Sequence, residues 1–92
     1  MKINVDKKPF DIWFRYSAYG KQKFTTAHLK DLMTNVEVTG WAICAADDQF
    51  SKKIGRKLAL KRLFESHFNG SENMEFRTGV WRALTDRGMK LN

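Results

Sequence analysis

Six basic side chains fall within fourteen consecutive residues of this 92-residue chain. The segment 51–64 contains no Asp or Glu and supplies +6 of the formal net charge of +7. A solvated helix usually mixes charges of both signs, because a Glu four residues before a Lys stabilises the helix. This segment forgoes that support, and its charge therefore predicts an anionic partner. The basic residues that we expect to contact such a partner are Lys52, Lys53, Arg56, Lys57, Lys61 and Arg62.

The first of these cations lie near the start of an expected helix over residues 49–67, which Asp47 or Asp48 would cap. Positive charge at a helix N-terminus opposes the helix dipole, which favours an acid there by ~0.3–1 kcal/mol. A phosphate bound at that end would be attracted by the lysines, the free N–H groups and the dipole together. Two other interpretations stay open. The lysines could keep a small domain in solution while their stems cover apolar surface, or they could face an acidic protein.

The run Ser-Lys-Lys-x-Gly-Arg-x-x-Ala-Leu-x-x-Leu-Phe at 51–64 resembles the start of the last helix of double-stranded RNA-binding domains. In that family the helix also follows a three-stranded antiparallel meander. The resemblance implies that Lys52, Lys53 and Arg56 bridge phosphates across a major groove, with duplex RNA as the ligand.

The same resemblance implies that the loop 20–23, which carries Lys21 and Lys23, enters a minor groove. The sequence departs from the family in that it lacks the Pro-x-His of this loop. No helix is expected before its first strand, and an extra helix is expected after the basic one. Duplex RNA is preferred only because of this resemblance. Duplex DNA fits the cations almost as well, because both present a phosphate backbone.

The chain as a whole also resembles short uncharacterised proteins of bacteriophages and other mobile elements. The resemblance is carried by residues 13–15 (Trp-Phe-Arg), by 25–29 (Thr-Thr-Ala-His-Leu) and by 50–57, where Phe-Ser precedes Gly-Arg-Lys. It implies a viral accessory role in the host cytoplasm. In this alternative the protein is a small inhibitor or adaptor, whose basic helix binds an acidic surface or the nucleic-acid channel of a host protein.

The chain before the basic segment has the apolar alternation of β-strands. Strands are expected at 10–18, 23–33 and 36–46, and Gly40 is a candidate bulge in the third. The connections between them are too short for a parallel crossover, which needs about a dozen residues. They therefore predict an antiparallel meander of three strands.

Two helices are expected after the strands, at 49–67 and 72–87. Ser71 is the expected N-cap of the second helix, and Gly88 is expected to end it. The predicted fold is a single α+β domain over residues 1–92, with the order β-β-β-α-α and both helices on one face of the sheet.

The basic helix has small residues on one side. Gly55, Ala59 and Leu63 recur every four residues, a line that would let the helix axis approach the sheet closely. Ile54 and Leu58 point to another side, where we expect the second helix to cover them.

Trp13 and Arg15 lie on the face of strand 10–18 opposite to its apolar residues. An outward aromatic side chain with a nearby cation could stack on the bases of a single strand. It could equally join two copies of the chain in a homodimer, or be covered by a loop.

The sequence argues against metal chemistry and catalysis. Cys44, His28 and His67 are the only nitrogen or sulfur ligands, too few for a structural zinc site, and no disulfide can form within the chain. Asp47 and Asp48 are better placed to cap a helix than to hold a catalytic metal. No nucleophile, acid–base pair or phosphate loop can be assembled, so we expect no enzyme activity and no cofactor. Because no apolar run could form a membrane span or a secretory signal, we expect a cytoplasmic protein without membrane contact.

Overall fold

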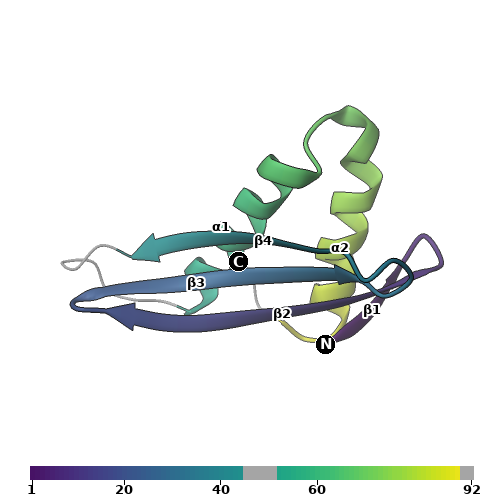
Figure 1. Cartoon of the computed structure of the whole chain (residues 1–92). Coiled ribbons are helices and arrows are strands. Elements are labelled where there is room, and N and C mark those ends of the chain that lie inside the picture. The colour runs from purple at the N-terminus through teal and green to yellow at the C-terminus, as the bar shows by residue number, and fades with distance from the viewer. Residues whose placement is uncertain (45–51, 90–92) are drawn as a thin grey trace.

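The computed structural model describes residues 1–44 and 52–89 of the chain. The elements in this part are β1 (Lys2–Val5), β2 (Lys8–Tyr19), β3 (Gln22–Asp31), β4 (Glu37–Cys44), α1 (Lys52–His67), the 3₁₀-helix η1 (Ser71–Asn73) and α2 (Met74–Asp86). The strands form one antiparallel sheet in the order β1-β2-β3-β4, and both helices stand on the same face of it (Figure 1). These features confirm the predicted α+β class, the antiparallel pairing and the placement of the helices.

The expected count of three strands is wrong, because β1 adds a fourth strand beside β2. Val5 pairs with Lys8, so the turn between the strands consists of Asp6 and Lys7, with φ of 52° and 65°. Two-residue hairpin turns with positive φ favour Asn-Gly or Asp-Gly, since glycine adopts this conformation without strain. An Asp-Lys turn carries no such glycine, and the hairpin therefore has a weak signal in the sequence.

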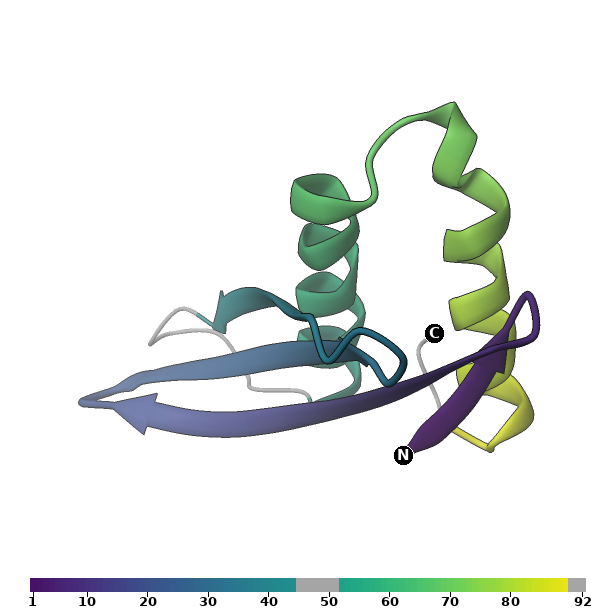
Figure 2. The ribbon, with the colours of Figure 1, turned by 45° about the vertical axis from the view of Figure 1, so that its right-hand side comes forward.

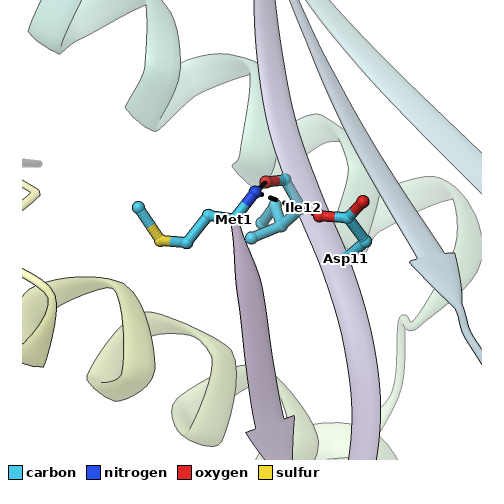
Figure 3. Close-up of polar contacts among 3 residues, drawn as sticks. All are labelled: Met1, Asp11 and Ile12. Atoms are coloured by element: carbon cyan, nitrogen blue, oxygen red, sulfur yellow. Dashed lines mark hydrogen bonds and ion pairs between the residues drawn. The ribbon is translucent and has the colours of Figure 1, made fainter.

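The N-terminal ammonium group holds the start of β1 against β2 (Figure 3). The Met1 nitrogen donates hydrogen bonds to Asp11 Oδ1 and to the carbonyl of Ile12, each at 3.0 Å. The amide of Ile12 donates in return to the carbonyl of Met1 at 2.9 Å. This pairing fixes the register in which Ile3 and Val5 are buried in the core.

β2 and β3 form a long hairpin whose tip extends beyond both helices (Figure 2). On the face covered by the helices, Ile12 lies opposite Leu29 and Phe14 lies opposite Ala27. Ile12, Leu29 and Ala27 are buried there. The two faces of the sheet therefore differ: one holds the core, and the other carries no helix from the described part of the chain.

Glycines allow α1 to lie very close to the sheet. Gly40 of β4 faces the α1 backbone at Ala59 and Leu63. Gly55 of α1 faces the hydroxyl of Thr25 on β3. The predicted line of small residues therefore does face the sheet. Gly40 is not a bulge, because β3 and β4 pair in unbroken register through it; its missing side chain makes room for the helix.

Aromatic rings fill the space between α1, α2 and the sheet. The Phe64 ring of α1 meets Trp81 of α2 edge to face, with centroids 5.9 Å apart. Phe76 of α2 lies 5.2 Å from Phe10 of β2 and 4.6 Å from Phe68, again measured between centroids. These contacts join the two helices to the N-terminal half of the sheet.

The expected boundaries need three corrections. Ser71 does not cap the second helix: it begins η1, and α2 starts at Met74 with no side-chain cap. The expected first strand begins two residues earlier, at Lys8, and the second ends two residues earlier, at Asp31. The basic helix ends at His67 as predicted, whereas its expected start and cap at 47–51 lie outside the described residues.

The expected cover over Ile54 and Leu58 is also wrong. Their side chains are 58% and 38% exposed, on the outer side of α1. Trp81 packs against Phe64 instead, because α2 lies beside the opposite flank of α1. The outer side of α1 therefore carries apolar as well as basic residues.

Candidate nucleic-acid interface

Three of the six cations form a stripe along the exposed side of α1. Lys53, Lys57 and Lys61 are spaced four residues apart, which places successive side chains on one side with a rise of roughly 6 Å each. All three are exposed. We call this set the lysine stripe.

The lysine stripe has no carboxylate partner among the described residues. Within this part of the chain, Asp11 contacts the Met1 ammonium group and Glu37 contacts the His28 ring, and both contacts lie on the sheet. The charge of the stripe is therefore turned to solvent, a state that the sequence alone could not establish.

Two other cations of α1 turn towards the sheet. Arg56 Nη1 donates a hydrogen bond to the Tyr16 hydroxyl at 3.0 Å. The Lys52 ammonium lies 4.9 Å from the centre of the Tyr16 ring, within the range of a cation–π contact. One side chain of β2 thus fixes the position of two basic groups at the first turns of α1.

Arg62 lies apart from the other cations. Its Nη1 donates to the carbonyl of Trp41 at 3.3 Å, which directs the guanidinium to the edge strand β4. The structure therefore divides the six predicted residues into the lysine stripe, the pair on Tyr16 and a single arginine at the sheet edge.

The cations predicted on the β2–β3 hairpin are divided between its tip and its two faces. Lys21 is at the tip, and Lys23 follows on the strand face that also carries Thr25, which contacts α1. Arg15 pairs with Thr26 on the opposite face. Lys21 and Lys23 therefore lie at the same end of the molecule as the start of α1, whereas Arg15 belongs to the other side of the sheet.

The face without helices carries a group of aromatic side chains. Trp13 stacks on His28 of the neighbouring strand, with centroids 5.0 Å apart and planes within 1° of parallel. Glu37 Oε2 lies 3.1 Å from His28 Nδ1. Trp41 and Ile43 of β4 are 53% and 42% exposed on this face. Trp13 therefore lies on the face opposite to the buried Ile12, as expected, and it is half-buried there.

Trp41 and Ile43 were not identified as site residues from the sequence. The alternation of side chains along residues 36–46 could have identified them. Both alternate with the buried Ala42, so their side chains lie on the opposite face of the strand. Gly40, which precedes Trp41, has no side chain to indicate which face it is on.

Metal-binding clusters and membrane spans are both absent from the described part of the chain. No group of three or more His, Cys, Asp or Glu side chains in this part is arranged to hold a metal ion. Neither described helix is long and apolar enough to cross a membrane.

Comparisons with protein families, with curated proteins and with solved structures find no match for this chain. The resemblance of residues 51–64 to the last helix of double-stranded RNA-binding domains therefore stays a prediction. The same holds for the resemblance of the whole chain to small phage proteins.

Proposed function

We propose that this protein binds nucleic acid through the backbone phosphates, with α1 as the main contact and with little sequence specificity. The observation that carries the proposal is the lysine stripe: three exposed ammonium groups in line, with no carboxylate partner among the described residues. Binding would then be driven largely by release of the counterions condensed on the nucleic acid.

The cations at the start of α1 extend this surface. Tyr16 holds Lys52 and Arg56 in place, which lowers the entropy that these long side chains lose when they meet a phosphate. Lys21 and Lys23 on the adjacent hairpin offer a second contact at the same end. A duplex suits this arrangement, because two separated basic elements can reach phosphates on either side of one groove.

A fluorescence-anisotropy titration over a range of salt concentrations tests the proposal, with duplex RNA, duplex DNA and single strands of equal length. The triple variant Lys53→Ala, Lys57→Ala, Lys61→Ala should reduce the slope of log K against log salt by about 0.9 for each duplex phosphate that it no longer neutralises. A control with the same change of charge replaces exposed cations outside the site, namely Lys2, Arg82 and Arg87.

The control variant should keep most of the slope. A stripe variant with the wild-type slope would contradict the proposal, since it would mean that these lysines do not contact phosphates. Equal reductions in the two triple variants would also contradict it, since they would mean that net charge alone governs binding. If the protein binds none of these nucleic acids at low salt, the proposal is also contradicted.

A second candidate function is supported by the apolar residues beside the lysine stripe. Ile54 and Leu58 are exposed next to it, and such residues are common in protein interfaces but add nothing to a phosphate contact. They favour the alternative of a small adaptor or inhibitor that binds an acidic surface of another protein. Leu58→Gln separates the two functions. If the protein binds nucleic acid, this variant should leave the slope of log K against log salt unchanged. If the protein binds an acidic protein surface, the variant should weaken binding to the isolated protein partner.

A further inference from the structure

A cavity of about 550 Å³ lies at the end of the sheet away from the β2–β3 hairpin tip. It is a half-open pocket bordered by the β1–β2 turn, the β3–β4 connection and the start of α2. Figure 2 shows the β1–β2 turn beside α2. The volume is within the range of about 300–1,000 Å³ that is typical of small-molecule sites. We propose that the cavity binds a small amphipathic cation, in which an ammonium or guanidinium group is carried on an apolar body.

The inner wall of the cavity is apolar. Phe10 and Leu29, which are both buried, line it, and so do Phe68 and Phe76, whose ring centroids are 4.6 Å apart. Val36 lines the cavity as well and is 60% exposed. An apolar ligand body would remove this surface from water, at roughly 25 cal/mol for each Å² buried.

The charged groups that line the cavity have the opposite balance to the rest of the chain. Four acidic residues line it, Asp6, Asp31, Glu72 and Glu75, against one basic residue, Lys8. The whole chain has 17 basic and 10 acidic residues, so a random set of its charged residues would contain more cations than anions. The cavity is therefore an acidic site in a basic protein.

These carboxylates make no ion pair with any cation of the described residues. Asp31 has a structural role, since its Oδ1 accepts hydrogen bonds from the amides of Met33 and Thr34 in the β3–β4 connection. No hydrogen bond engages the carboxylates of Glu72 and Glu75 within the described part of the chain. Both side chains are exposed, so a ligand cation would pair with them without breaking an existing contact. The apolar wall beside the acids requires that the same ligand be partly apolar.

The ligand class follows from these two properties together. A nucleic acid is excluded by its charge, so this site is separate from the lysine stripe and does not depend on the function proposed above. A metal ion alone would leave the apolar wall unused. An arylalkyl amine satisfies both requirements, because its ring can lie against Phe68 and Phe76 while its ammonium faces Glu72 and Glu75.

Titration of the isotope-labelled full chain, followed by NMR, tests the proposal with three probes of nearly equal shape: 3-phenylpropylamine, 3-phenylpropan-1-ol and 3-phenylpropionate. The amine, which is a cation at pH 7, should give saturable shifts of the methyl signals of Val5, Val36 and Val38. The alcohol should bind more weakly at the same signals, and the carboxylate should bind most weakly. Equal affinities for the three probes, or shifts centred on other residues, would overturn the proposal.

The variant Glu72→Gln, Glu75→Gln should lower the affinity for the amine roughly fivefold for each carboxylate that lies near 4 Å from the ammonium. It should leave the affinity for the alcohol unchanged, a result that general damage to the fold would not give. The matched control is Glu65→Gln, Asp86→Asn, which removes two exposed carboxylates that do not line the cavity. An equal reduction of amine affinity in both variants would contradict the assignment.

Discussion

The Cα of Gly40 on β4 faces the backbone nitrogen of Leu63 on α1, with no room for a side chain between them. A Cβ at this position would overlap main-chain atoms, which cannot turn away as a side chain can. Gly40→Ala should therefore destabilise the protein by about 3 kcal/mol, at the upper end of the range for overpacked cores. Urea unfolding followed by Trp fluorescence measures the change.

Gly79→Ala is the matched control for this substitution. A Cβ at position 79 of α2 would meet a methyl group of Val5 rather than backbone. The better helix propensity of alanine, worth about 1 kcal/mol over glycine, offsets part of that crowding. If Gly79→Ala costs as much as Gly40→Ala, close backbone contact is not what makes position 40 special.

Thr25 offers a prediction of increased stability. Its side chain is 1% exposed beneath α1, and its hydroxyl has no hydrogen-bond partner among the described residues. A buried hydroxyl without a partner costs about 1–3 kcal/mol. Thr25→Val keeps the shape and removes the hydroxyl, so the free energy of unfolding should rise by about 1 kcal/mol.

Thr25→Ser provides the opposite change at the same position. It keeps the hydroxyl and removes a buried methyl group, so it should destabilise the fold by about 1 kcal/mol. A valine variant that is less stable than the wild type would contradict this prediction.

Local patterns in the sequence are sufficient to predict much of the fold. Alternation locates β2, β3 and β4, and the spacing of Gly55, Ala59 and Leu63 identifies the side of α1 that faces the sheet. β1 escapes prediction because its turn, Asp6-Lys7, adopts positive φ without a glycine. The exposure of Leu58 could not be predicted, because no local pattern indicates which side of α1 the second helix will cover.

The candidate sites can be predicted only in part, for the same reason. Helical spacing places the lysine stripe on one side of α1, but the contacts of Arg56 with Tyr16 and of Arg62 with Trp41 join segments far apart in the chain. The acidic cavity is lined by separate segments of the chain, and its carboxylates have no common spacing. Such sites depend on tertiary packing.

Arg77 is a structural cation, and should behave differently from the lysine stripe. Its Nη1 donates to the carbonyls of Phe68 and Gly70 at 2.6 and 2.7 Å, which fixes the connection between α1 and α2. Hydrogen bonds from a charged donor contribute about 1.5–3 kcal/mol, so Arg77→Ala should destabilise the protein by about 2 kcal/mol. Thermal and urea unfolding give the value.

Arg82→Ala serves as the control for Arg77→Ala, because Arg82 is an exposed arginine on the same helix. Its removal should change the stability by less than about 0.5 kcal/mol. Similar destabilisation in both variants would mean that the charge of α2, and not the two carbonyl contacts, stabilises the connection.

Tyr16 should influence nucleic-acid binding although it carries no charge. Its hydroxyl accepts the hydrogen bond from Arg56 and its ring lies under the Lys52 ammonium, so it positions both cations before any ligand arrives. Immobilising a long side chain on binding costs about 0.5–1.5 kcal/mol. Tyr16→Ala should therefore weaken duplex binding about fivefold or more at fixed salt, whereas Tyr16→Phe, which keeps the ring, should have roughly half that effect in free energy.

Tyr19→Ala tests whether the effect belongs to Tyr16 or to any tyrosine of the hairpin. Tyr19 ends β2 three residues further on and is 81% exposed. Its removal should leave the affinity unchanged, since none of the described cation contacts involves its ring or hydroxyl. Anisotropy titrations of the three variants at one salt concentration decide the matter. If Tyr16→Ala binds as tightly as the wild type, the cations at the start of α1 either need no positioning or do not contact the phosphates at all.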